Sequence, residues 1–146
     1  MRIFTIGFTK KSAQEFFSLL ENNGVKSVVD VRLNNSSQLA GFSKGRDLSY
    51  LLNKIIGINY IHSIELAPTR EILDAYKKKQ FNWFEYEKRF FALLEQRRPQ
   101  IAAEIDRLDQ ACLLCSEDVP HQCHRRLVAE YIQRVNPGVN IEIIHL

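Results

Sequence analysis

The sequence predicts a three-layer α/β sandwich with a mostly parallel five-stranded sheet and a helical insert before the fourth strand. The first observation is that short apolar, β-branched segments alternate with longer amphipathic segments along the chain. This alternation is typical of a parallel sheet covered by helices on both faces. The second observation is that the alternation is interrupted between about Thr69 and Gln110, where the pattern is helical throughout.

The first half of the chain has the pattern of a βαβαβ unit. A capping box at Ser12 begins the first helix, and Gly24 ends it. A polar loop rich in Asn, Ser and Gly occupies residues 33–47, and the second helix covers residues 48–56. Short runs of apolar, β-branched residues predict the strands, which cover residues 2–8, 26–31 and 58–61.

The second half begins with the helical insert. Thr69 caps a helix that reaches the lysines at 77–79, and Asn82 caps an aromatic-rich helix to about Gln96. Pro99 suits the first turn of a further helix to about Asp109. The chain then returns to alternation, with a strand at 111–115, a helix from about 123 to 135 and a strand at 140–145.

Composition restricts the class of protein. The 146 residues, 45% hydrophobic and 25% charged, are typical of one globular domain covering residues 1–146. No apolar run has the length of a membrane span, and the N-terminal stretch lacks the pattern of a signal peptide. Three cysteines, an odd number, indicate no disulfide framework, so we expect a cytoplasmic protein without a membrane partner. A net charge of +3 permits nucleic-acid binding without requiring it, and the oligomeric state is left open.

Ionisable residues follow several of the predicted strands. Thr9 follows the first strand, Asp30 and Arg32 end the second, and Cys115 and Glu117 end the fourth. Open parallel sheets bind ligands beyond the carboxyl ends of their strands. We therefore expect the functional site at that edge of the sheet.

The leading hypothesis is an enzyme that acts on a nucleotide or nucleic acid. Glu117 would act as general acid or base, because a partly buried strand end raises a carboxyl pKa. Asp30 and His124 would assist, and the start of a helix would make Cys123 a reactive thiol. The residues expected to bind the anionic substrate are Arg32, Arg125, Thr9 and Lys44.

Several alternatives stay open. Asp30 and Arg32 could form a plain ion pair that orders the following loop. Cysteines and histidines in the stretch CSEDVPHQCHRR, residues 115–126, could bind a metal, but the paired C-x2-C spacing of a zinc knuckle is missing. We therefore assign no metal ligand and leave the cofactor open. Cys115 and Cys123 could instead serve a redox protein, whereas Cys112 reads as a buried core residue.

A further alternative is a non-catalytic nucleic-acid-binding module. The lysines at 77–79 could contact phosphates, and the aromatic residues between 81 and 91 could stack on bases. The helical spacing of these aromatic residues also suits packing against the sheet. The structural alternatives are that the lysines form a solvent-exposed helix face and that the aromatic residues pack in the core.

Six short motifs are spread over nearly the whole chain: TIGFT at 5–9, VVDVR at 28–32, GFSK at 41–44, NYIH at 59–62, LLCSE at 113–117 and CHRRLVAEYI at 123–132. Together they resemble the bacterial and archaeal family named domain of unknown function 488. That family usually has His or Tyr and then Ser where this chain has Phe8 and Thr9. It often has a proline soon after DVR, and LGG after NYIH, where this chain has NNS and LAP. The resemblance implies a compact α/β fold with a shared polar site, and it associates some members with nucleic-acid metabolism and defence against foreign DNA.

Overall fold

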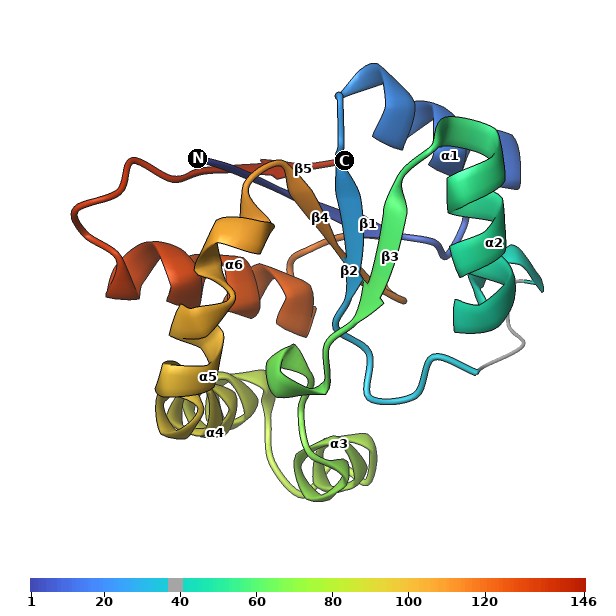
Figure 1. The fold of residues 1–146 in the computed structure, drawn as a ribbon. Coiled ribbons are helices and arrows are strands. Elements are labelled where there is room, and N and C mark those ends of the chain that lie inside the picture. Colours follow the sequence, from blue (N-terminus) through green and yellow to red (C-terminus); the bar gives the residue numbers. More distant parts are fainter. Residues whose placement is uncertain (37–40) are drawn as a thin grey trace.

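The computed structural model describes residues 1–36 and 41–146, and these residues form one sheet of five parallel strands in the order β3-β2-β4-β1-β5 (Figure 1). Helices lie on both faces of the sheet (Figure 1), so the predicted α/β sandwich is confirmed. Of the predicted polar loop, Ser37 lies outside the described residues. The strands are β1 (Arg2–Gly7), β2 (Ser27–Asp30), β3 (Asn59–His62), β4 (Ala111–Cys115) and β5 (Glu142–His145).

The strand β4 separates two apolar layers, because successive side chains of a strand point to opposite faces. Cys112 and Leu114 pack in the layer beneath α1 (Ala13–Asn22) and α2 (Gly45–Ile56). Leu113 and Cys115 pack in the opposite layer, together with residues of α4 (Trp83–Gln96) and α6 (His124–Val135). Cys112 and Cys115 therefore face different sides of the sheet.

Side-chain caps begin three of the helices, as the sequence predicts. The side chains of Ser12, Thr69 and Asn82 accept hydrogen bonds from backbone N–H groups three residues later, at 3.1, 3.3 and 3.0 Å. Each such cap stabilises its helix by about 1 kcal/mol. They begin α1, α3 (Arg70–Lys77) and α4 respectively.

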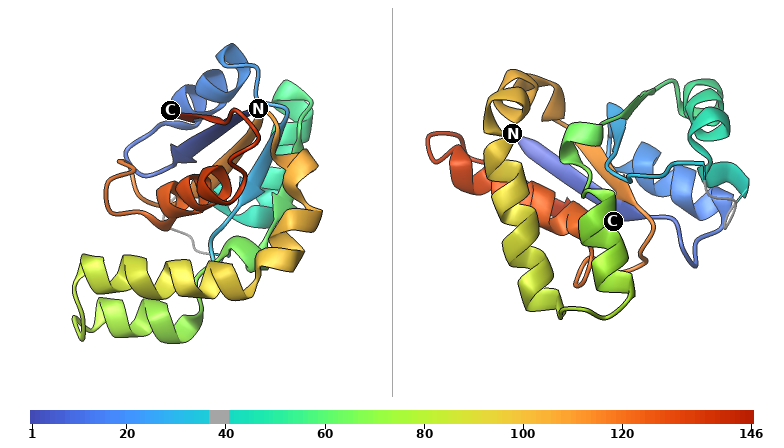
Figure 2. Two further views of the ribbon diagram at one scale, coloured as in Figure 1. Left: turned by 90° about the vertical axis from the view of Figure 1, so that its left-hand side faces the viewer. Right: turned by 90° about the horizontal axis from the view of Figure 1, so that it is seen from below.

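The helical insert contains α3, α4, α5 (Arg98–Ala103) and a short 3-10 helix (Ile105–Leu108). Figure 2 shows α3 and α4 side by side, and Tyr76 of α3 contacts Trp83 of α4 with ring centroids 5.7 Å apart. The single helix expected from Pro99 to about Asp109 is broken at Glu104, whose backbone angles leave the α region. None of the described helices has the length and apolar character needed to span a bilayer.

The polar loop after β2 is shorter than predicted. A 3-10 helix (Gly41–Ser43) precedes α2, which begins at Gly45 rather than at residue 48. Tertiary contacts explain the early start: the N–H of Gly45 donates to the carbonyl oxygen of Asn35 at 2.8 Å. Phe42 packs against Phe16, with ring centroids 5.4 Å apart. Phe42 is therefore part of the α1 and α2 layer.

Candidate functional site

The carboxyl ends of the strands share one edge of the sheet. Gly7 at the end of β1 is in register with Cys115 at the end of β4. Asp30 of β2 is in register with His62 of β3 and Leu114 of β4. Because the strands are parallel, the residues that follow them converge on the edge where such sheets bind ligands.

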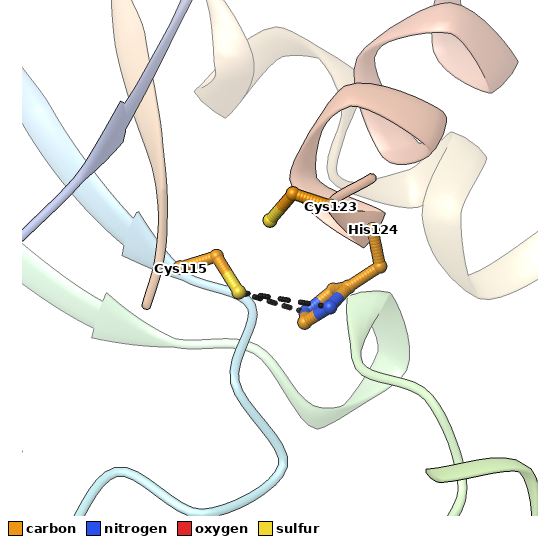
Figure 3. Close-up of side chains that lie close together, drawn as sticks. All are labelled: Cys115, Cys123 and His124. Atoms are coloured by element: carbon orange, nitrogen blue, oxygen red, sulfur yellow. Dashed lines mark hydrogen bonds between the residues drawn. The ribbon is translucent and has the colours of Figure 1, made fainter. Parts of the chain in front are cut away.

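Cys115, Cys123 and His124 form a buried cluster at this edge (Figure 3). One side-chain ligand atom from each residue lies within 4.8 Å of the other two. Cys115 ends β4, whereas Cys123 is the N-cap and His124 the first residue of α6. Their exposed fractions are 4%, 2% and 9%, so the cluster is buried, and residues 116–122 connect its two ends along the chain.

The imidazole of His124 is held in one orientation. Its Nε2 lies 2.8 Å from the carbonyl oxygen of Val31. A carbonyl can only accept, so Nε2 carries the proton and Nδ1 keeps its lone pair. The Sγ atom of Cys115 lies 3.6 Å from each ring nitrogen, and Phe90 packs edge-on against the ring. Burial lowers the pKa of His124, which keeps the imidazole neutral near pH 7.

The two thiols of the cluster have opposite pKa shifts because they share a hydrogen bond. The Cys123 thiol donates to Cys115 and lowers the pKa of the Cys115 thiol against the effect of burial, and backbone N–H groups of Ser116 and Glu117 lower it further. The same hydrogen bond, together with burial, raises the pKa of Cys123. These directions do not support the expectation of a reactive thiol at Cys123, at the start of α6, and they favour Cys115 instead.

A pocket of about 390 Å³ opens beside this cluster, between the ends of β2 and β4 and the helical insert. Of the residues predicted for the site, the structure places four in the pocket wall, namely Arg32, Glu117, Cys123 and His124. Glu117 is exposed, not partly buried as expected. The exposed side chain of Lys77 in α3 also lines the pocket.

Asp30 and Arg32 form a buried ion pair, the alternative considered for them above. Arg32 Nε and Nη2 donate to the two carboxylate oxygens of Asp30 at 2.8 and 2.6 Å, and Nη2 also donates to the carbonyl of Ser43 at 2.7 Å. Burial alone lowers the pKa of Arg32, but the hydrogen bond and charge of Asp30 outweigh it and leave that pKa raised. Arg32 Nη1 is buried and has no hydrogen-bond partner within residues 1–36 and 41–146. Asp30, also bonded by the Tyr60 hydroxyl, does not line the pocket.

Arg125 and Thr9 hold the loop after β4 and do not line the pocket. The Arg125 side chain is fully buried, and its Nη1 and Nη2 donate to the carbonyl oxygens of Glu117 and Asp118 at 2.5 and 3.1 Å. Thr9 Oγ1 donates to the carbonyl oxygen of Ser116 at 2.6 Å. These donors, predicted to bind a substrate anion, are used by the protein backbone.

Two further residues that the sequence singled out lie away from the pocket. Lys44 is the N-cap residue of α2 and is not part of the pocket wall. His121 is exposed in the loop before α6 and is not part of the buried cluster. Other residues of the same two segments do line the pocket, among them Asn34 of the long loop and Gln122 before α6.

The sequence reasoning missed part of the pocket wall. Cys115 was not among the predicted catalytic residues, although its place at the end of a buried strand marks it, and Tyr76 was not among the aromatic residues considered for base stacking. Trp83 and Tyr86, which were considered for base stacking, line the pocket together with Tyr76. Trp83 and Tyr86 stack with centroids 4.7 Å apart while packing against the core, so the predicted core packing also holds. Their i, i+3 spacing is the available signal that they share one helix face.

Comparisons with known proteins give one match. The family model described as "Domain of unknown function DUF488" matches residues 12–132, which include the buried cluster and most of the pocket wall. No curated protein and no solved structure matches the chain. The geometry of the site is therefore the basis for its chemistry.

Proposed function

Since the chain belongs to the DUF488 family, described as one of unknown function, we propose from the geometry that it is an enzyme acting on a nucleotide, free or within a nucleic acid. One observation carries the proposal. The pocket at the carboxyl edge of the sheet joins aromatic side chains, cationic side chains and the buried Cys–His cluster in a single wall. A nucleotide presents a ring to stack and an anion to bind, and this wall has groups for both.

The aromatic part of the wall suits a base. Tyr76 and Trp83 are partly exposed, and their rings meet at an interplanar angle of 65°. Stacking of a base on such a ring contributes about 1–3 kcal/mol. The cationic part suits a phosphate: Lys77 is exposed, and the Arg32 guanidinium has one nitrogen without a hydrogen-bond partner in the described chain.

The chemical groups lie in the same wall. Glu117 is the candidate general acid or base, because it is the carboxylate of the candidate set that lines the pocket and remains exposed. His124 and Cys123 lie beside Cys115 in the floor of the same site. Asp30, Arg125 and Thr9 act by positioning the loops that hold these groups, since the Asp30 carboxylate, the two Nη atoms of Arg125 and the Thr9 hydroxyl are bonded within the fold.

Thermal unfolding tests ligand binding. We expect mononucleotides to raise the melting temperature more than nucleosides or inorganic phosphate do, because a ligand bound only to the folded state stabilises it. Lys77→Ala should weaken nucleotide binding by about tenfold, the loss expected for one charge-assisted hydrogen bond. Lys78→Ala is the matched control, because Lys78 is also exposed but lies outside the pocket wall.

A flat response to every nucleotide and oligonucleotide, or equal effects of the two lysine variants, would contradict the proposal. Binding of oligonucleotides alone, with a steep salt dependence, would indicate a non-catalytic nucleic-acid-binding module instead. Turnover is tested on the nucleotide that binds. Glu117→Gln should lower the rate by about 100-fold or more, whereas Glu21→Gln, an exposed change on α1, should not.

A further inference from the structure

We propose that Cys115, Cys123 and His124 bind one Zn²⁺ ion, with the fourth coordination position facing the pocket. The residues come from the end of β4 and the start of α6, and all three line the pocket. The C-x7-C-H spacing lacks a paired knuckle, which is why the sequence alone did not favour a metal. The inference does not depend on which substrate enters the pocket.

The separations within the cluster suit tetrahedral zinc. With Zn–S near 2.3 Å, Zn–N near 2.1 Å and a tetrahedral angle, a sulfur and a nitrogen ligand lie about 3.6 Å apart. Cys115 Sγ lies 3.6 Å from Nδ1 of His124. The ligand atoms of the whole set, Cys123 included, lie within 4.8 Å of one another. One ion can therefore contact all three after small side-chain rotations.

The surroundings of His124 are those of a metal-bound histidine. Ligating histidines donate their second ring N–H to a carbonyl or carboxylate, which fixes the tautomer and the ring orientation. His124 donates from Nε2 to the carbonyl oxygen of Val31 at 2.8 Å. The lone pair of Nδ1 is thereby free for a ligand, and Cys115 Sγ lies 3.6 Å from both ring nitrogens (Figure 3), so Cys115 must rotate to share an ion with Nδ1.

The surroundings of Cys115 suit a thiolate ligand. The guanidinium of Arg125 donates to the carbonyl oxygen of Glu117, two residues after Cys115, and places a positive charge at this strand end. Thiolates bound to metals are stabilised by such outer contacts. Two thiolates would balance the charge of one Zn²⁺, so the buried cluster would become neutral when the ion binds.

The number and type of ligands point to a zinc site open to substrate. Structural zinc sites use four protein ligands, whereas catalytic sites use three and leave one position for water or substrate. The cluster supplies two sulfur ligands and one nitrogen ligand, and the pocket lies beside it. Thiolate and imidazole ligands select zinc over magnesium or calcium. Zinc at this position would add a Lewis acid to the pocket wall.

Metal analysis of the purified full chain tests the proposal. We expect about one zinc ion per chain, and a chelator should remove it with a fall in melting temperature. Cys115→Ala, Cys123→Ala and His124→Gln should each weaken zinc binding by more than about 100-fold, beyond the effect of losing an outer-shell partner. Cys112→Ala and His121→Gln are the matched controls, because Cys112 faces the opposite layer and His121 is exposed outside the cluster.

Cobalt substitution of the wild-type chain keeps the test valid if a variant fails to fold. Thiolate-to-cobalt charge-transfer bands of an intensity typical of two sulfur ligands would support the site. The proposal would be overturned if the wild-type chain, with its thiols reduced, bound no zinc when zinc is added. It would also be overturned if the control variants lost zinc as the ligand variants do. Purified protein that carries another metal at these residues in place of zinc would overturn the assignment to zinc. A wild-type chain that binds nucleotide but no zinc would reject this inference and leave the proposed function standing.

Discussion

Asp30 shows how completely one side chain can be used by the fold. Its carboxylate accepts hydrogen bonds from the Arg32 guanidinium and from the hydroxyl of Tyr60, and it also accepts the backbone N–H of Arg32 at 3.1 Å. A buried carboxylate is tolerated only with such partners. The same residue type at the same strand end could have served catalysis, but here its acceptor positions are occupied.

We therefore expect Tyr60→Phe to destabilise the protein. The change removes the hydroxyl that donates to Asp30 at 2.6 Å, and a hydrogen bond to a charged group contributes about 1.5–3 kcal/mol. Urea unfolding measures the loss. Tyr50→Phe is the control, because the Tyr50 side chain is 63% exposed and its change should cost less than about 0.5 kcal/mol. Equal losses in the two variants would show that the bond to Asp30 is not stabilising.

At the scale of elements, the junction between β1 and the loop after β4 builds the site. Thr9 and Arg125 bind the backbone of that loop, and Gly7 allows its close approach. A Cβ atom on Gly7 would lie 1.6 Å from the carbonyl oxygen of Glu117. The loop can therefore follow its path only because Gly7 has no side chain.

Gly7→Ala should consequently displace the loop and destabilise the protein by more than about 3 kcal/mol, at the upper end of overpacking effects. Chemical denaturation measures the stability, and the proposed zinc binding would report the position of Cys115, the residue directly before the displaced loop. Gly138→Ala is the matched control, because nothing lies within 4 Å of the Cβ atom it adds. A Gly7→Ala protein as stable as the control would contradict the close approach.

At the scale of the whole molecule, α4 and α6 are held together by a polar contact as well as by the apolar core that they share. The hydroxyl of Tyr131 in α6 donates to Glu95 of α4 at 2.8 Å. Burial and this hydrogen bond raise the pKa of Tyr131 to about 12. The tyrosine of an unfolded chain ionises near pH 10.

The folded protein therefore keeps a proton that the unfolded chain loses between about pH 10 and 12. The contribution of Tyr131 to stability is complete below pH 10 and is lost as the pH rises through this window. Between these two pH values, the free energy of unfolding should fall less steeply with pH for Tyr131→Phe than for the wild type. Tyr50→Phe, at an exposed position, should leave the slope unchanged. Identical slopes for wild type and Tyr131→Phe would contradict the shift.

Local patterns in the sequence were sufficient for most elements. The strand at 111–115 and the caps at Ser12, Thr69 and Asn82 occur where they were predicted. These features depend on residues close together in the chain. The signals are the periodicity of apolar side chains, the side-chain oxygens that cap helices, and the residues that end a helix or strand. The same information predicted that polar groups would gather at the carboxyl edge of a parallel sheet.

The composition of the site depended on contacts between residues far apart in the chain. Alternation along β4 directs Cys115 toward α6 and Cys112 away from it, but the meeting of Cys115 with His124 also requires the path of the intervening loop. Arg125 serves that loop, and the insert helices supply the aromatic wall. The type of a residue determines which bonds its side chain can form. Which partners come within bonding distance is determined by packing between distant parts of the chain. That is why the edge of the sheet was predictable from the sequence and the division of its residues between structure and pocket was not.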